Sequence, residues 1–470
     1  MTAANVIILA EIFISVIGIL FGLRYVVRGS SVSLRTLSIL LVLFCGTLVT
    51  ALIYSHSLVN AASRENVVEK KISTLSEAVR LNPTASLYTS RAEALAAAGE
   101  ADKALRDVAR AIAIAPGNAE ANRLREKLSV PQPRYTITDL GTLGGDRSLA
   151  YGINSLGHIT GFSELPGNPS AGFHAFLYDG QMHDLGALND SPHNAPRSMS
   201  SGAKINDSDQ VVGNTYGDGG GATAFVWDAA NGMRSLGFPN TYGVAINNKG
   251  QILVQASTIV PEQPVPAFLF HPATGREVIP PLASQDGCFP NVSAVNDSGV
   301  VVGYCERSKR LPSVLQAFVW DSTHGTQVLD SPGSIQSIAR SMNSKGRISG
   351  EIGVKLGVGR AVTWDTSSGL QMLPLVTDRL ERTLNTGAYS INDQGYIVGM
   401  GSVLIDSRGV IQNGVLWIGS VGYLLDNLIP PSSGWHLIEA TAINNAGQIA
   451  GYGEVEGKTH AFRLDPVSIQ

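Results

Sequence analysis

One short pattern recurs seven times between residues 150 and 452 of this 470-residue chain. Each copy holds an apolar residue, an Asn, two variable residues and usually a Gly, and an Ile or Val follows after one further residue. Successive copies lie 41 to 52 residues apart and are centred on Asn154, Asn206, Asn247, Asn296, Asn343, Asn392 and Asn444. A period of this size indicates an array built from one supersecondary unit.

Each copy predicts a β-hairpin. The residues on both sides of the turn are mainly Ile and Val, which favour strands. The Gly, three positions after the Asn, supplies the positive φ that a tight reversal needs, and the Asn side chain can bond its own backbone two residues on. Asp209 takes the Gly position in the second copy. The seven copies therefore predict seven hairpins with the same turn.

Two further apolar segments follow most hairpins and complete a four-stranded unit. The third segment is seen at 224–227 and 317–320, and the fourth at 182–186. Four short strands in roughly 40 to 50 residues make one propeller blade. We therefore predict a mainly β fold, with a seven-bladed β-propeller over residues 131–470.

The two ends of the repeat region predict that the ring is closed. The seventh unit stops near residues 464–466 without a fourth strand, whereas segment 137–141, before the first unit, matches the fourth-strand segment 184–186. An N-terminal strand that completes the last blade would remove an exposed sheet edge. Closure favours a propeller over an open solenoid.

The tripeptide His-Ala-Phe stands at 174–176 and 460–462, and Asp-Leu-Gly-x-Leu-Gly-Gly stands at 139–145. Together with the Asn-centred pattern, these motifs resemble the HAF-repeat family, probable extracellular repeat proteins of bacteria, over roughly residues 135–465. Blades 2 to 6 lack the His, and Val254 replaces the second Gly of the third copy. The resemblance implies a repeat architecture and an extracellular location, but no common activity.

Two apolar segments near the N-terminus, 6–23 and 37–54, predict two transmembrane helices within residues 1–59. Each segment is 18 residues long, close to the roughly 20 that cross a bilayer core. Arg24, Arg28 and Arg35 lie between them, whereas no Lys or Arg precedes the first segment.

The positive-inside rule places this Arg-containing connection in the cytoplasm and both termini outside, although Arg64, Lys70 and Lys71 favour the opposite orientation. We therefore expect a multi-pass protein of the cell (inner) membrane, with its propeller facing the periplasm or exterior.

Residues 60–130 have a helical composition that resembles a tetratricopeptide repeat. The matching small and large positions are Tyr88, Ala92, Leu95, Gly99, Ala104, Val108, Ala111 and Pro116. Such a segment could bind a partner peptide in a groove or act as a spacer. Fewer than three complete repeats favours the spacer. Pro131 and Pro133 then form a stiff linker at the domain boundary.

Charge and cysteine content limit the partners. Residues 131–470 carry 20 Lys and Arg against 28 Asp and Glu, the wrong sign for binding nucleic acid. Cys288 and Cys305 bracket the hairpin of Asn296, so either a disulfide or two reduced thiols fits the sequence.

No catalytic, cofactor or metal motif is present in the sequence. His174 and His460 occupy equivalent places in two blades, so we interpret them as a repeated structural contact, and we find no paired carboxylate for His193 or His436. We therefore expect a binding or scaffolding protein that recognises a protein or glycan through the propeller face. The alternatives are an envelope hydrolase or lyase that acts on glycans at the channel mouth, and a cytoplasmic interaction hub similar to WD-repeat proteins.

Overall fold

The computed structural model divides the chain into two compact units, residues 1–122 and 123–470. It describes residues 70–98, 100–129, 133–167, 172–188, 199–216, 221–256, 267–282, 288–307, 314–355, 358–365, 368–377, 384–405 and 409–467.

The first unit is helical, with a helix over 70–81 followed by α3 (Ala85–Ala97) and α4 (Ala101–Ile114), and α5 (Ala119–Ser129) follows. The Thr84 hydroxyl caps α3 by accepting a hydrogen bond from the backbone N–H of Leu87. Between α3 and α4, the Arg91 guanidinium donates two hydrogen bonds of 2.6 and 2.9 Å to the buried carboxylate of Asp107. This bidentate pair fixes how the two helices pack.

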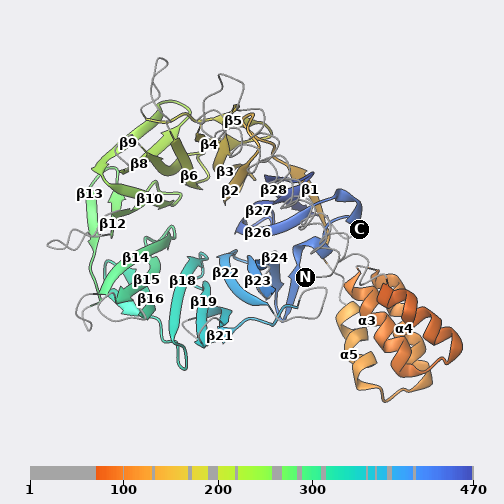
Figure 1. The fold of residues 1–470 in the computed structure, drawn as a ribbon. Helices are drawn as coiled ribbons and strands as arrows, with labels where there is room; N and C mark the ends of the chain where they lie inside the picture. Colours follow the sequence, from red (N-terminus) through yellow and green to blue (C-terminus); the bar gives the residue numbers. More distant parts are fainter. Residues whose placement is uncertain are drawn as a thin grey trace, which may run out of the picture. The chain divides into compact units, whose positions relative to one another are not determined.

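The second unit consists of seven four-stranded antiparallel sheets, which Figure 1 shows as sectors around one axis. The first strands of neighbouring blades contact one another around this axis. They are β2 (Ser148–Ile153), β6 (Met199–Ile205), β10 (Thr241–Ile246), β14 (Cys288–Val295), β18 (Gln336–Met342), β22 (Asn385–Ile391) and β26 (His436–Ile443). The second strands are β3 (Ile159–Glu164), β7 (Val211–Tyr216), β11 (Ile252–Ala256), β15 (Val301–Arg307), β19 (Ile348–Lys355), β23 (Ile397–Ile405) and β27 (Ile449–Val455).

The outer half of each blade holds its third and fourth strands. The third strands are β4 (Phe173–Tyr178), β8 (Ala222–Asp228), β12 (Ala267–His271), β16 (Val314–Asp321), β20 (Val358–Asp365), β24 (Gly409–Ile418) and β28 (Lys458–Pro466). The fourth strands are β5 (Met182–Asp184), β9 (Gly232–Pro239), β13 (Gly275–Ile279), β17 (Gly325–Val328), β21 (Gly369–Met372), β25 (Val421–Leu424) and, in the seventh blade, β1 (Tyr135–Asp139). The seven-bladed β-propeller predicted from the repeat is confirmed.

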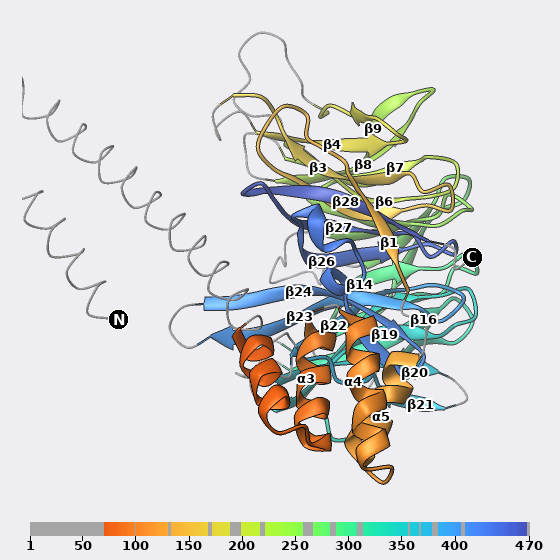
Figure 2. The same cartoon turned by 90° about the vertical axis from the view of Figure 1, so that its right-hand side faces the viewer.

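Closure of the ring by the N-terminal strand is also confirmed. Strand β1 pairs with β28, with Tyr135 opposite Pro466 and Asp139 opposite Phe462. Figure 1 and Figure 2 both place β1 next to β28. The Tyr135 side chain is buried with Leu437 and Leu464, and this burial raises its pKa to about 12.

The Ala-Phe pair of the third strand packs the blades against each other. Ala175 lies in one apolar cluster with Phe225 of the following blade, and Phe176 lies in another cluster with Ala461 of the preceding blade. All four side chains are fully buried. Successive strand residues point to opposite faces of a sheet, so the small residue of one blade receives the large residue of the next.

The seven Asn side chains form a nearly complete ring of hydrogen bonds. Six of them donate from Nδ2 to the backbone oxygen of the Asn in the next blade, over 2.8 to 3.2 Å. The last of these bonds runs from Asn444 back to Asn154. Asn296 differs, since among the described residues its Nδ2 meets only the Met342 Sδ, at 4.0 Å.

Each Asn also fixes its own turn. The Asn392 Oδ1 accepts hydrogen bonds from the backbone N–H groups of Gln394 and Tyr396, at 3.1 and 2.9 Å. The residue three positions after the Asn has positive φ, including Asp209 at 56°. The Asx turn predicted from the sequence is therefore present, and Asp209 accepts the left-handed conformation that the other six copies assign to Gly.

The membrane location predicted from the sequence is contradicted. None of the helices in the described parts of the chain is both long and apolar enough to span a bilayer. The longest of the helices α3 to α5 has 14 residues, against the roughly 20 that spanning requires. This finding corrects the expectation of a multi-pass protein of the cell (inner) membrane whose propeller faces the periplasm or exterior. The two apolar segments 6–23 and 37–54 lie outside the described residues.

Cys305 is disulfide-bonded and buried. The strand register places Cys305 opposite Pro290, two residues along β14 from Cys288. Of the two states that the sequence allowed for Cys305, the oxidised one is present.

We expect Asn392→Asp to destabilise the propeller more than Asn296→Asp. Both variants keep the oxygen that accepts the turn hydrogen bonds, but only the first replaces a buried donor with a carboxylate facing the Asn444 carbonyl. The difference should be about 1–3 kcal/mol, the cost of losing a buried hydrogen bond. Urea unfolding followed by Trp fluorescence measures it, and equal midpoints would show that the ring contributes no stability.

The closing strand gives a second test. Tyr135→Ala should lower the free energy of unfolding by about 3–5 kcal/mol, because it opens a cavity where β1 joins the core. Thr136→Ala, at the exposed neighbouring position, is the control and should change it by less than about 0.5 kcal/mol. If the two variants unfold at the same urea concentration, β1 is not needed for closure.

Candidate functional site

At the Asn end of the axis, the inner strands surround a cavity of about 280 Å³. Three layers line it, formed in each blade by the residue before the Asn, the Asn itself and the residue after it. The third layer also joins blades, since the backbone N–H of Ser155 donates to Asp207 and that of Asp393 donates to Asn445. Most polar groups here are used to hold the ring together, so this end is structural.

A different pattern lies three residues before each Asn, where every first strand has a β-bulge. A bulged residue has no cross-strand partner, and bulges often lie beside functional sites. The seven bulged residues differ in kind: they are Tyr151, Ala203, Val244, Ser293, Arg340, Tyr389 and Thr441. Large polar side chains thus gather in blades 5, 6 and 1.

The second strands contribute a matching position, eight residues after the Asn. Its occupants are Phe162, Asn214, Gln255, Tyr304, Glu351, Met400 and Tyr452. Asn214 and Gln255 accept hydrogen bonds from the first strand of the next blade. Glu351 and Tyr452 instead bond polar side chains of the first strand in their own blade. We call Tyr151, Arg340, Glu351, Tyr389, Glu439 and Tyr452 the axial cluster.

Arg340 and Glu351 form the ion pair of the cluster. Nη2 of Arg340 lies 2.6 Å from Oε1 of Glu351, and the guanidinium lies 5.6 Å from the ring centroid of Tyr389. Gly387, on the first strand of blade 6, leaves room for this arrangement, because a Cβ there would collide with the Glu351 carboxylate. Nε of Arg340 is buried without a hydrogen-bond partner among the described residues. The pair therefore keeps a donor for a further oxygen atom.

Glu439 and Tyr452 form the second polar pair, in blade 7. The Tyr452 hydroxyl donates to Oε2 of Glu439 at 2.7 Å. Burial raises the pKa of Glu439 and the nearby charge of Glu351 adds to this, although Tyr452 and Arg340 oppose the rise. Burial and the charge of Glu439 raise the pKa of Tyr452 well above its usual range. Tyr452 therefore stays a neutral donor rather than a base.

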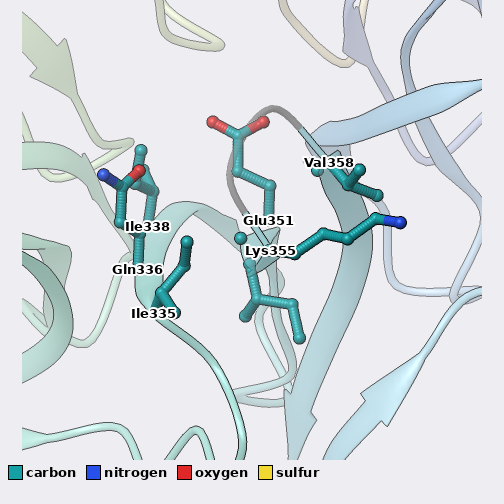
Figure 3. A pocket seen from close by; sticks show the side chains of 9 residues that line it. Ile335, Gln336, Ile338, Glu351, Lys355 and Val358 are labelled. Carbon is teal, nitrogen blue, oxygen red and sulfur yellow. The ribbon is translucent and has the colours of Figure 1, made fainter.

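Glu351 also lines a cavity of about 190 Å³ formed by residues of the first three strands of blade 5. Figure 3 shows its carboxylate above apolar walls formed by Ile338 and Val358, while the amino group of Lys355 points away. The cavity thus places one carboxylate against an apolar surface at the edge of the axial cluster.

A row of partly exposed aromatic rings extends from the cluster into blades 1 and 2. The centroid distances are 6.0 Å from Tyr151 to Phe162, 4.9 Å from Phe162 to Phe173 and 6.4 Å from Phe173 to Tyr216. The Arg147 guanidinium lies over Phe162 at 5.7 Å. The rings are tilted by 47° to 65° to one another, so this aromatic row gives the end of the axis opposite the Asn ring an uneven apolar platform beside the polar cluster.

Lys204 also lies on a first strand, two residues before Asn206. Its Nζ donates to the backbone oxygen of Tyr151 in the neighbouring blade, at 2.7 Å. Burial lowers the pKa of this amine to about 8. The residue as a whole keeps some accessible surface, while its amine is enclosed by the inner strands.

The histidines singled out in the sequence make a repeated contact. Nδ1 of His174 lies 2.8 Å from Asp184, and Nδ1 of His460 lies 2.9 Å from Asp139, each linking the third strand of a blade to its fourth. Hydrogen bonds from His174 and from the Gly186 N–H lower the pKa of Asp184 against the effect of burial.

His436 pairs with Asp426 at 2.9 Å, a carboxylate partner that the sequence did not reveal, whereas His193 lies outside the described residues. In the parts of the chain that the structure describes, no three His, Cys, Asp or Glu side chains gather to hold a metal ion.

Sequence reasoning did not find the axial cluster. Its members come from four blades, 1, 5, 6 and 7, and no two of them form a linear motif. A signal was present, however: the seven copies can be aligned on their Asn, and the positions three before and eight after it vary while the turn stays constant. Polar residues confined to a few copies would have marked these positions.

No family model matches the chain, so its resemblances to the HAF-repeat and tetratricopeptide families stay predictions. No curated protein matches it either. Among solved structures, the chain is similar to AofleA from Arthrobotrys oligospora, with 12% identity over 62% of this chain and 90% of that one, and a TM-score of 0.34.

It is also similar to a lectin of Aleuria aurantia, described as a six-bladed β-propeller with a novel mode of fucose recognition, with 10% identity over 55% of this chain and 90% of that one, and a TM-score of 0.33. Polysaccharide lyase Uly1 matches with 9% identity over 72% and 100% of the two chains, with a TM-score of 0.33. At these identities and TM-scores, the three matches carry no conclusion about this chain.

We expect Lys204→Met to stabilise the propeller by roughly 1–2 kcal/mol at pH 7, because it removes a charge that the fold desolvates. The folded-state pKa of about 8 lies below the ordinary 10.5, so the folded protein binds fewer protons between these values. The free-energy cost of desolvating the charge of Lys204 is therefore largest below pH 8, and it disappears as the pH rises to 10.5.

Urea unfolding at pH 7 and pH 10.5 measures this, with Lys204→Arg as the variant that keeps a charge. If Lys204→Met raises the free energy of unfolding equally at both pH values, the charge of Lys204 is not the cause of the stabilisation.

Proposed function

We propose that the propeller is a binding protein for carbohydrate, with its site at the end of the axis opposite the Asn ring. The axial cluster carries this proposal, because it breaks the sevenfold repeat with hydrogen-bonding groups that the fold does not need. The Arg340 donors, the Glu351 acceptors and the Tyr hydroxyls, which do both, suit a ligand rich in hydroxyl groups.

The aromatic row supports the same class of ligand. Sugar rings present flat C–H faces that pack on aromatic side chains, and their edges carry the hydroxyls. Phe162, Phe173 and Tyr216 continue the line of rings that begins at Tyr151 of the cluster. A glycan of several units could contact the platform and the cluster together.

The charge of the site favours a neutral ligand. Arg340 is already paired with Glu351, so its charge is not free to hold an anionic ligand, and Glu439 adds no positive group. Residues 131–470 carry 20 basic against 28 acidic residues, which disfavours a polyanion. An uncharged oligosaccharide fits both features. We retain, as part of this proposal, membership of the repeats in the HAF-type group.

Cleavage of a glycan is the second candidate function, and the difference between Glu439 and Glu351 favours it. Burial raises the pKa of Glu439, whereas Glu351 is held beside Arg340. One carboxyl whose pKa is raised and a second that is ion-paired match the two roles that carboxyl groups have in glycoside hydrolysis.

The test is an array of neutral and acidic oligosaccharides probed with the full chain, followed by calorimetry with the best ligand. We expect a neutral glycan to bind and Gly387→Ala to weaken its binding at least about tenfold, because the new methyl group displaces Glu351. Gly359→Ala is the control, since the nearest atom to its methyl group would be the Thr386 oxygen at an ordinary 3.8 Å.

Loss of binding in Gly387→Ala alone, with an unchanged unfolding curve, supports the site. Equal binding by both variants would place the ligand elsewhere, and an array without any bound glycan would contradict the proposed function. New reducing ends in the ligand after incubation, absent with Glu439→Gln, would favour the cleaving enzyme over the binding protein.

A further inference from the structure

The cavity beside Glu351 combines one carboxylate with apolar walls. Nine residues line its volume of about 190 Å³, and of these nine only Glu351, Gln336 and Lys355 have polar side chains. Figure 3 shows Ile338 and Val358 on opposite sides of the Glu351 carboxylate, while the Lys355 amine points away from the cavity. A group that enters this space therefore meets a hydrogen-bond acceptor and an apolar surface together.

Glu351 can still accept a hydrogen bond from a ligand. Its Oε1 accepts one from Nη2 of Arg340 at 2.6 Å, and no other donor among the described residues is bonded to this carboxylate. The Glu351 side chain is 24% exposed, so a ligand can reach it. An ionised carboxylate accepts several hydrogen bonds and donates none. The group that binds here must therefore supply the hydrogen.

The neighbouring guanidinium favours a neutral donor. A cationic group on the same carboxylate would lie close to the charge of Arg340, and like charges repel. A neutral O–H or N–H group avoids this repulsion. A hydroxyl group alone, however, would leave the walls formed by Ile338 and Val358 in contact with water. Both surfaces are satisfied by a group that carries a neutral donor and an apolar part on one edge.

An acetamido group has this arrangement. A secondary amide is planar and trans, so its carbonyl oxygen lies opposite its N–H. The methyl group then lies on the same edge as the N–H. We propose that the cavity holds the acetamido group of an N-acetylated sugar, with the N–H donating to Glu351 and the methyl group against Ile338 and Val358. The ligand class is then a neutral glycan that contains N-acetylhexosamine units.

This inference rests on the proposed function and narrows it. Glu351 belongs to both the axial cluster and the cavity, so an acetamido group held there brings its sugar ring beside Arg340 and Tyr389. An N-acetylhexosamine is uncharged, which agrees with the excess of acidic residues in the propeller. The cavity thus selects the substituent, and the remainder of the cluster contacts the ring that carries it.

The test is calorimetry of the full chain with matched pairs of trisaccharides, which differ only in having an acetamido or a hydroxyl group at carbon 2 of each ring. Pairs with gluco and galacto rings are used. We expect the acetamido member of one pair to bind about tenfold more tightly, because it places two additional carbon atoms against apolar walls. A 6-deoxy trisaccharide is included, since it also presents a methyl group beside a hydroxyl group.

A variant that fills the cavity locates the preference. Val358→Phe should remove the tenfold difference while the hydroxyl member keeps its affinity, because the larger ring occupies the space of the acetyl group. Val278→Phe, at a 48% exposed position in blade 3, is the matched control and should keep the difference. Urea unfolding of both variants shows whether each is folded. Val358→Met, a smaller substitution, replaces Val358→Phe if the latter unfolds at a lower urea concentration, and should reduce the difference.

The outcomes separate this inference from the proposed function. If both members of every pair bind equally, or the 6-deoxy trisaccharide binds most tightly, the acetamido subsite is wrong and the glycan-binding function stands. A preference that persists in a folded cavity-filling variant also overturns the inference, because the acetamido group is then recognised elsewhere. If no glycan binds at all, the proposed function fails and this inference fails with it.

Discussion

Hydrogen bonds from asparagine side chains to the backbone of the next blade hold the propeller together at one end of its axis. Each of these residues acts twice, since its Oδ1 shapes the turn of its own hairpin while its Nδ2 joins the neighbouring hairpin. The two roles use opposite ends of one amide, so neither Asp nor Gln can replace Asn without losing one of them. The bond from Asn444 to Asn154 closes the ring where β1 and β28 also meet. Stability and closure therefore depend on the same repeated residue.

This dependence explains which parts of the structure the sequence could predict. The turn, its period and the closing strand are encoded by residues that recur or match another copy, so the propeller, its blade number and the pairing of segment 137–141 followed from the pattern. The axial cluster did not follow, because Arg340, Glu351 and Glu439 each occur in one copy only. The predicted membrane location failed for a different reason: it rested on the composition of segments 6–23 and 37–54, with no repeat or pairing to check it.

The bulges explain how a repeat can carry a unique site. A residue in a regular strand must suit the residue opposite, but a bulged residue has no cross-strand partner and its type is free to change. In this propeller the bulge recurs three residues before each Asn, so seven such positions surround one axis. Ala203 and Val244 show that a small or apolar residue suffices for folding, and Tyr151, Arg340 and Tyr389 show what the same position can present. The fold thus separates a constant end that holds the ring from a variable end that can bind.

Two ionisable groups near the axis oppose folding rather than support it. Burial raises the pKa of Glu439 and lowers that of Lys204, so in each case the folded protein disfavours the charged form. Neither group belongs to the Asn ring or to the Ala-Phe packing between blades. The other blades form the same four-stranded sheets without an equivalent Lys or Glu. Residues that lower the stability of a fold and are not needed for its packing are typical of sites that perform chemistry or binding. The ring of Asn amides and the closing strand provide the stability that allows these two groups to remain in a desolvated interior.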